Sequence, residues 1–125
     1  MSKFVIDAYA WIAYLDGSNQ KIKELMDQDR ELYTNIVTVA EVISKTKRKN
    51  FDIDVAFEAI HSLSIIFNVD ANLCKEVGLL HAQVRKEIKD FGLADAFVLL
   101  TAKKLNAKIL TGDPHFKGFS EAILI

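Results

Sequence analysis

Short apolar runs alternate with longer segments of helical periodicity along almost the whole chain. The runs are rich in Val, Ile, Leu and Phe, as buried parallel strands are. Strands that alternate with helices through short connections form a parallel sheet covered by helices. The sequence therefore predicts an α/β fold, a three-layer α/β/α sandwich whose central parallel sheet has four to five strands.

The same pattern sets the expected element boundaries. The β-favouring runs predict strands at residues 3–6, 31–36, 64–69, 108–110 and 122–125. Spaced apolar residues predict helices at residues 8–15, 20–30, 38–49, 52–63, 71–89 and 93–105. No linker, repeat or low-complexity segment interrupts the series, so we expect one domain over residues 1–125.

Composition narrows the class of protein. Hydrophobic residues make up 50% of the chain and charged residues 26%, the balance of a soluble globular protein. The net charge of −1 argues against a protein that binds nucleic acid through bulk positive charge, although local basic patches remain possible. The sequence shows neither a secretory leader nor a membrane span, and we expect its one cysteine, Cys74, to be a small core residue. These features favour the cytoplasm.

Two aspartates bracket a helix and a strand between Gly92 and Phe116. Asp95 stands in the first turn of a helix that is apolar around most of its circumference, where a carboxylate is costly without a cation nearby. Asp113 follows the strand at residues 108–110. Ligands of parallel α/β sheets bind at the carboxyl ends of the strands, which is where this loop puts Asp113.

Two further acids are expected at the same edge of the sheet. Asp7 directly follows the first strand, and Glu41 lies early in the helix after the second. Carboxylates that share a poorly solvated pocket repel one another strongly, and Mg²⁺ or Mn²⁺ relieves that repulsion. The pattern predicts a Mg²⁺ or Mn²⁺ site made by Asp7, Glu41, Asp95 and Asp113.

Structural explanations exist for three of these acids. Thr38 and Glu41 fit a capping box at a helix start. Asp113 fits an N-cap followed by a proline, and Asp95 can answer the positive end of its helix dipole. Taken singly, Glu41 and Asp113 are better explained by capping than by catalysis. The convergence of all four acids on one edge favours a functional site.

The segments around the acids resemble the PIN domain family and, within it, the small single-domain ribonucleases of VapC toxin type. The similar segments are residues 4–7, 38–42, 93–97, 101–102 and 109–116. The resemblance extends over essentially the whole chain. It implies that Asp7, Glu41, Asp95 and Asp113 bind Mg²⁺ or Mn²⁺ and support RNA hydrolysis, leaving a 5′-phosphate and a 3′-hydroxyl.

The resemblance also implies partners and a supporting residue. A VapC-type chain has a cognate antitoxin protein and forms a homodimer, for which Trp11, Tyr14 or the apolar faces of the early helices are available. Thr111 would orient a metal-bound water or a phosphate. An ordinary β-branched strand residue is an equally good interpretation of Thr111.

Other residues are candidates for contacts with RNA. Basic side chains could hold the RNA backbone or simply form a solvated surface; they are Lys45, Lys47, Arg48 and Arg85. Many relatives carry a small hydroxyl residue just after the first acid, where this chain has Ala8 and Tyr9. Tyr9 could stack on a base, although packing is the simpler interpretation. His115 could contact a phosphate, although a surface loop histidine without a role is simpler.

The leading hypothesis is a metal-dependent endoribonuclease, the toxin of a type II toxin–antitoxin pair. One alternative keeps the fold and makes the chain an RNA-processing nuclease. A second alternative is a receiver-like signalling module, in which clustered acids bind Mg²⁺ and one aspartate accepts phosphate. That class requires a paired acid near the first strand and a lysine after a late strand. This chain has a lone Asp7 and Thr111-Gly112-Asp113 at those places.

Overall fold

A single parallel sheet forms the middle layer of the fold in the computed structural model, which describes every residue except Met1 and Asp29. Its order is β3-β2-β1-β4-β5, and every neighbouring pair is parallel. The strands are β1 (Lys3–Ile6), β2 (Glu31–Asn35), β3 (Ile65–Phe67), β4 (Lys108–Thr111) and β5 (Ala122–Leu124). The predicted parallel α/β/α sandwich is confirmed, with β1 at the centre.

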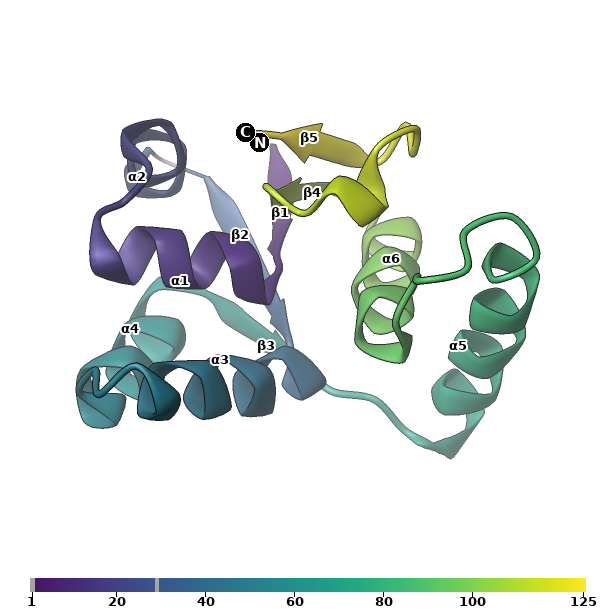
Figure 1. Ribbon diagram of the computed structural model, residues 1–125, viewed down its shortest axis with the longest axis horizontal. Coiled ribbons are helices and arrows are strands. Elements are labelled where there is room, and N and C mark those ends of the chain that lie inside the picture. Colours follow the sequence, from purple (N-terminus) through teal and green to yellow (C-terminus); the bar gives the residue numbers. More distant parts are fainter. Residues whose placement is uncertain (1, 29) are drawn as a thin grey trace.

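Helices cover both faces of the sheet (Figure 1). One face carries α1 (Ala8–Asp16), α2 (Gln20–Asp27), α3 (Ile36–Arg48) and α4 (Ile53–Leu63), and the other carries α5 (Ala71–Val84) and α6 (Leu93–Leu105). A 3₁₀ turn, η1 (Pro114–Phe116), follows β4. Side chains of β1 alternate between the two layers: Phe4 and Ile6 pack on the α1 side, and Val5 packs on the α6 side. None of the helices in the described part of the chain has the length and apolarity that crossing a bilayer requires.

Several predicted boundaries are wrong by a few residues. The helix expected from Thr38 begins at Ile36, because the Asn35 side chain accepts a hydrogen bond from the Val37 backbone N–H at 2.8 Å. The helix expected to run to residue 89 ends at Val84 and continues as turns. The helix expected over residues 20–30 ends at Asp27, where the backbone becomes extended at Gln28, and Asp29 lies outside the described residues. Strands β2 and β3 are shorter than expected.

Two side chains differ from expectation in burial. Cys74 is exposed, so the prediction of a core cysteine is wrong. It lies near the start of α5, a helix that is fully buried only at Val77. Trp11 is fully buried, and its indole N–H donates to the Thr34 hydroxyl at 3.0 Å. Trp11 is therefore a core anchor of α1 and is not available to a homodimer interface.

Asn35 links the two helices that carry Glu41 and Asp95. Its side chain is 0% exposed. Besides capping α3, its amide donates to the Thr101 hydroxyl at 2.9 Å, and that hydroxyl donates to the Phe97 carbonyl at 2.7 Å. The start of α3 is thus held against the middle of α6.

Replacing Asn35 with alanine should lower the free energy of unfolding by ~2 kcal/mol. The change removes a helix cap and a buried hydrogen bond together. The measurement is urea unfolding of the metal-free protein. Asn72→Ala, at an exposed position of α5, is the matched control and should have an effect below ~0.5 kcal/mol. Equal effects of the two substitutions would contradict the linking role of Asn35.

Candidate active site

Among the acids that the structure describes, Asp7 is the most buried, with 5% of its surface exposed. It follows β1 and caps α1, and its Oδ1 accepts a hydrogen bond from the Ala10 N–H at 2.8 Å. Its Oδ2 accepts a hydrogen bond from the Thr111 hydroxyl. Burial outweighs these two hydrogen bonds and raises the pKa of Asp7 from 3.8 to about 7.

Thr111 connects Asp7 to the loop that carries Asp113. Its side chain is fully buried at the end of β4. The hydroxyl donates to Asp7 and accepts a hydrogen bond from the Asp113 backbone N–H at 2.9 Å. With its proton already directed at Asp7, this hydroxyl is suited to positioning the two acids rather than to orienting a water or phosphate, the role that the resemblance implies.

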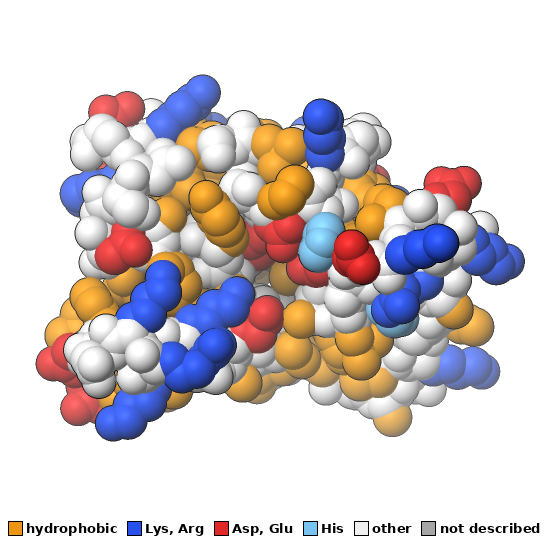
Figure 2. All heavy atoms as spheres, viewed as in Figure 1, with side chains coloured by type: hydrophobic (Ala, Val, Ile, Leu, Met, Phe, Trp, Pro, Cys, Tyr) orange, Lys and Arg blue, Asp and Glu red, His pale blue; other side chains and the backbone are white. Residues whose placement is uncertain are grey.

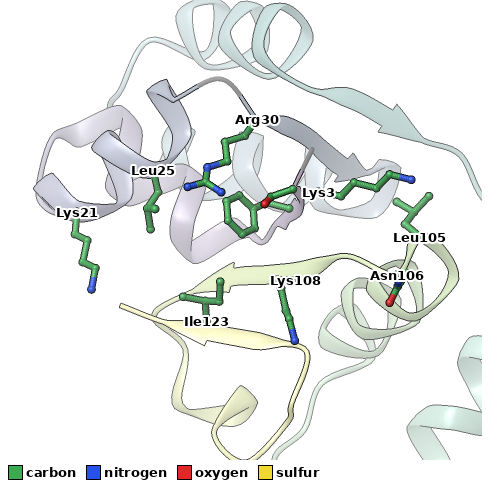
Figure 3. A pocket seen from close by; sticks show the side chains of 10 residues that line it. Lys3, Lys21, Leu25, Arg30, Leu105, Asn106, Lys108 and Ile123 are labelled. Carbon is green, nitrogen blue, oxygen red and sulfur yellow. The ribbon is translucent and has the colours of Figure 1, made fainter.

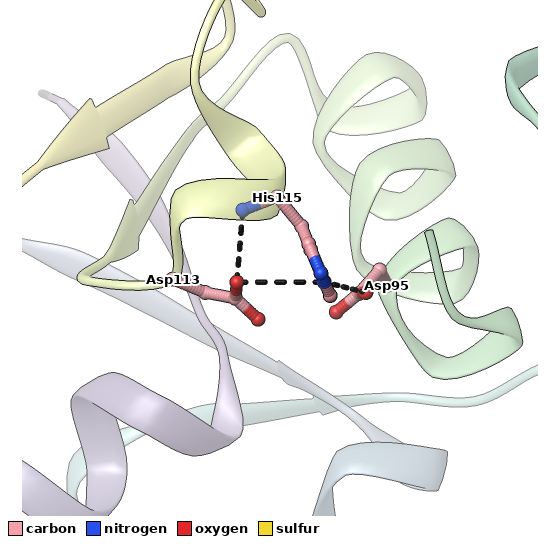
Figure 4. Close-up of side chains that lie close together, drawn as sticks. All are labelled: Asp95, Asp113 and His115. Atoms are coloured by element: carbon pink, nitrogen blue, oxygen red, sulfur yellow. Dashed lines mark hydrogen bonds and ion pairs between the residues drawn. The ribbon is translucent and has the colours of Figure 1, made fainter. Parts of the chain in front are cut away.

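Asp95, Asp113 and His115 meet beside this network (Figure 4). The His115 Nδ1 lies 3.3 Å from Asp95 Oδ2 and 3.5 Å from Asp113 Oδ1. One ligand atom from each residue falls within a group no wider than 4.8 Å, the spacing of a possible metal site. The structure thus places the ring of His115, which was expected to be a surface loop residue, between two acids of the predicted site. The one signal for it in the sequence was its position two residues after Asp113.

The capping explanations have different outcomes. Asp113 caps η1 and accepts the His115 N–H at 2.9 Å, and Asp95 Oδ2 accepts the Gly92 N–H at 3.0 Å. These bonds orient the two acids and still leave carboxylate oxygens free, since each oxygen can accept more than one bond. The capping box at Thr38 is wrong: Asn35 is the cap, and Glu41 lies beyond the first turn of α3.

Glu41 is half-buried on the α3 side of the acid cluster. Burial raises its pKa; Lys45, one turn further along α3, lowers it, and the charges of Asp95 and Asp113 raise it again. Burial likewise raises the pKa of Asp95, with the Gly92 N–H opposing and Asp113 adding to the rise. Asp113 and Asp95 also raise the pKa of Asp7. Asp95 and Asp113 are thus close enough to repel each other and both Asp7 and Glu41, whereas Asp7 and Glu41 lie outside the group of Asp95, Asp113 and His115 ligand atoms.

The arrangement fits a hard divalent cation. The donors are mainly carboxylate oxygens, which suit Mg²⁺ and Mn²⁺, whereas a site for Zn²⁺ would be richer in nitrogen or sulfur. All of the acids lie at the carboxyl edge of the sheet, after β1 and β4 or near the starts of α3 and α6. The positive charge of a cation would offset both the burial of Asp7 and the mutual repulsion.

The comparison with protein families decides the relationship. The PIN domain family model matches residues 4–122. The chain belongs to the PIN domain family. None of the curated proteins matches the sequence significantly.

Solved structures show the same PIN fold at low sequence identity. The chain is similar to the VapC20 toxin of Mycobacterium tuberculosis, described as cleaving the sarcin–ricin loop, with 19% identity and a TM-score of 0.78 over 94% of this chain and 97% of that one. It is also similar to VapBC2 of Rickettsia felis bound to promoter DNA, with 18% identity and a TM-score of 0.73 over 98% of this chain and 97% of that one. It is similar as well to a toxin–antitoxin complex of Klebsiella pneumoniae, with 19% identity and a TM-score of 0.71 over 95% of this chain and 94% of that one.

The sheet order argues against the receiver-like alternative. Receiver-type α/β sheets have the order 2-1-3-4-5, with the first strand next to the edge. This PIN domain has the order 3-2-1-4-5. Its switch point therefore lies between β1 and β4, and Asp7 and Asp113 follow these two strands.

The predicted RNA-binding residues fall into two groups. Lys45, Lys47 and Arg48 lie in the last turns of α3, and Figure 2 shows basic side chains over this helix beside the acidic centre of the same face. Lys45 and Arg48 line a groove with α1, whereas Lys47 is exposed outside that lining. Arg85 ends α5 on the opposite face of the sheet. The structure does not bring Arg85 together with the basic residues of α3.

A second, larger cavity lies at the opposite edge of the sheet (Figure 3). Its volume is about 650 Å³, and its basic lining residues are Lys3, Lys21, Arg30 and Lys108. No carboxylate is among the described residues that line it. This cavity can attract anions but offers nothing to a divalent cation, so it is separate from the PIN acid cluster.

Asp7→Asn should make the stability of the metal-free PIN domain less dependent on pH. The native state keeps a proton on Asp7 that the unfolded chain releases between pH 3.8 and about 7. The free energy of unfolding of the wild-type domain therefore falls by up to ~4 kcal/mol as the pH rises through this window. The amide has no such charge to bury, so Asp7→Asn should be the more stable protein at pH 8 and similar to wild type at pH 4.

The measurement is urea unfolding in a chelator at several pH values. Asp54→Asn, at an exposed position of α4, is the control and should follow the wild-type profile. If the free energies of unfolding of wild type and Asp7→Asn changed with pH in the same way, the burial of Asp7 would not hinder its ionisation.

Proposed function

We propose that this PIN domain is a Mg²⁺- or Mn²⁺-dependent endoribonuclease and the toxin of a type II toxin–antitoxin pair. RNA is its substrate, and Asp7, Glu41, Asp95 and Asp113 are its metal-binding and catalytic residues. One domain over residues 1–125 performs the reaction.

One observation carries the proposal: ligand atoms of Asp95, Asp113 and His115 lie within 4.8 Å of one another at the switch point of a PIN fold, and burial raises the pKa of the neighbouring Asp7 to about 7. Without a cation, the burial of Asp7 and the repulsion from Asp95 and Asp113 lower the stability of the fold. A buried acid that is retained despite its cost to folding is typical of a functional site.

The residues divide the work of positioning and binding. Asp7, Asp95 and Asp113 would hold the metal, with Glu41 at the α3 side of the cluster. A bound divalent ion supplies positive charge that attracts a phosphodiester and makes water more acidic. Thr111 fixes the direction of Asp7, and the Asn35–Thr101 hydrogen bond fixes α3 against α6, so the acids meet the phosphate in a set geometry. His115, between Asp95 and Asp113, lies where it can contact a phosphate oxygen.

Similarity to toxin–antitoxin structures supports the toxin assignment. The neighbours include complexes described as VapBC, in which a toxin is held with its antitoxin. A cognate antitoxin and a homodimer are therefore the partners that we propose, in the cytoplasm. An antitoxin segment would inhibit this site by bringing an arginine or an aromatic residue against the acids.

A processing nuclease with the same fold is the second candidate, and PIN membership by itself supports it equally. The genetic setting separates the two. A small gene for a DNA-binding protein directly upstream, whose co-expression relieves growth inhibition by this chain, fits only the toxin. Expression without any effect on growth fits the processing enzyme.

Removing single acids should abolish RNA cleavage. Asp95→Asn and Glu41→Gln each keep the size of the side chain and remove one charge from the metal site. We expect the cleavage rate of a mixed RNA pool in Mn²⁺ to fall at least about a hundredfold in each. The same loss should follow removal of the metal by a chelator and should be reversed by adding Mn²⁺ back.

Asp54→Asn is again the control, because it removes an exposed carboxylate on α4 and should leave the rate unchanged. The products should carry a 5′-phosphate and a 3′-hydroxyl. Full metal-dependent cleavage by Asp95→Asn would refute the proposed site. Cleavage by the wild type in excess chelator would refute the metal requirement.

A further inference from the structure

The geometry points to a nucleotide-binding subsite in the groove between α1 and α3, in which Tyr9 stacks on a base of single-stranded RNA and Lys45 and Arg48 hold the neighbouring phosphates. The inference rests on the proposed function for its choice of RNA as the ligand. It assigns to Tyr9 a role in substrate binding that neither the acid cluster nor the fold requires.

Tyr9 is held in place by its contact with Gly112. A Cβ atom at Gly112 would lie 2.1 Å from Cε1, 2.6 Å from Cζ and 2.7 Å from Cδ1 of the Tyr9 ring. One edge of the ring therefore rests directly on the backbone between Thr111 and Asp113. Only glycine leaves room for the ring there. The loop that carries an acid of the active site thus also supports this aromatic ring.

The remaining surface of Tyr9 is available to a ligand. The residue is 47% exposed. Its hydroxyl forms no hydrogen bond with another described residue, so the side chain is not retained as part of an internal polar network. An aromatic ring that is already immobilised and half-exposed loses little conformational entropy when a base stacks on it. Tyr9 therefore packs against Gly112 along one edge of its ring, as expected, while the rest of the ring is exposed.

The opposite wall of the groove is positively charged. A cavity of about 410 Å³ lies between Tyr9, Ile12 and Ala13 of α1 and the basic end of α3. Its basic lining residues are Lys45, Arg48 and Lys49. None of the three forms an ion pair with a described carboxylate within 4 Å. These cations are therefore not already neutralised by a salt bridge from the described part of the chain, and a phosphate can use them.

The groove also contains one acid, Asp16, which lines a neighbouring pocket together with Lys49. The Asp16 carboxylate accepts the Ser18 N–H at 2.8 Å and forms no ion pair with a described cation within 4 Å. Arg48 Nε donates to the Ser44 carbonyl at 3.3 Å, which leaves the terminal nitrogens of the guanidinium free among the described residues. An aromatic surface faces a cationic wall, the combination that single-stranded RNA requires.

The groove continues directly from the acid cluster. Tyr9 is two residues after Asp7 and rests on the residue before Asp113, and Lys45 is one turn after Glu41. Figure 2 shows the basic side chains of α3 adjoining the acidic centre on one face. A strand whose scissile phosphate is at the acids can therefore place the next nucleotide over Tyr9. A duplex cannot, because its bases are already stacked on one another.

The test measures RNA affinity without cleavage. Asp95→Asn serves as the non-cleaving parent, and the probe is a short, labelled, mixed-sequence single-stranded RNA followed by fluorescence anisotropy in Mg²⁺. Tyr9→Ala should weaken binding about five- to a hundredfold, and Tyr9→Phe should stay within about twofold of the parent, because stacking needs the ring and not the hydroxyl.

A glycine variant tests the support of the ring. Gly112→Ala should displace the Tyr9 side chain, which can rotate away, and so weaken RNA binding nearly as much as Tyr9→Ala. Adding Gly112→Ala to Tyr9→Ala should cause little further loss. Additive losses would show that Gly112 acts independently of Tyr9 and would overturn this support.

Salt dependence tests the cationic wall. Lys45→Gln and Arg48→Gln should each reduce the slope of log affinity against log salt concentration by about 0.7. Lys21→Gln is the matched control, because Lys21 lines the separate basic cavity at the opposite edge of the sheet (Figure 3). It should change neither affinity nor slope. An effect of Lys21→Gln in place of the α3 variants would move the RNA to that cavity and overturn the subsite.

The results separate the subsite from the nuclease function. If the wild type cleaves RNA with metal and Tyr9→Ala binds RNA as tightly as the parent, the subsite is wrong and the nuclease function is retained. This result is also expected if the groove binds a protein segment in place of RNA. Weaker RNA binding by Tyr9→Ala in a chain that does not cleave RNA supports the subsite and refutes the function. A parent with no measurable RNA affinity overturns the subsite.

Discussion

The repulsion among carboxylates at one edge of the sheet is the constraint on which the rest of the site depends. Asp7 has the most extreme position, since it is 5% exposed and burial raises its pKa to about 7. Asp95 and Asp113 add their charges to this cost. The parallel sheet brings Asp7 and Asp113 to the same edge, because β1 and β4 are neighbours and both end there.

The scaffold directs the acids without neutralising them. Asp7, Asp95 and Asp113 each accept a backbone N–H near the start of a helix or turn, and Thr111 bridges Asp7 to the loop of Asp113. Neutral donors fix orientation and leave the negative charge in place. The His115 ring lies between Asp95 and Asp113, with its Nδ1 3.3 Å and 3.5 Å from their carboxylate oxygens. The negative charges gathered here therefore lower the stability of the fold, as is common at functional sites.

Much of this could be predicted from the sequence. The period of apolar residues gave the parallel α/β class, and strand ends gave the edge where Asp7 and Asp113 lie. Glu41 was harder, because Thr38 and Glu41 fit a capping box by residue type, whereas the cap of the helix is Asn35, three residues before Thr38. A cap is chosen by the backbone conformation at the end of β2, which residue types alone do not specify.

Other features depend on contacts between distant segments. The position of His115 between two acids follows from how η1 turns toward α6, and Tyr9 meets Gly112 across more than a hundred residues of sequence. The exposure of Cys74, which was expected to be buried, and the distance between Arg85 and the basic residues of α3 both depend on how α5 packs. Local pattern locates such residues on an element but does not say which neighbour they face.

The central claim is that the acid cluster exists to bind a divalent cation. The most direct measurement is an anomalous difference map from crystals soaked in Mn²⁺ near pH 8, where Asp7 is ionised. The account predicts a strong peak within coordination distance of carboxylate oxygens of Asp7, Asp95 and Asp113. A map in which Mn²⁺ binds elsewhere and leaves these three carboxylates without a peak would contradict it.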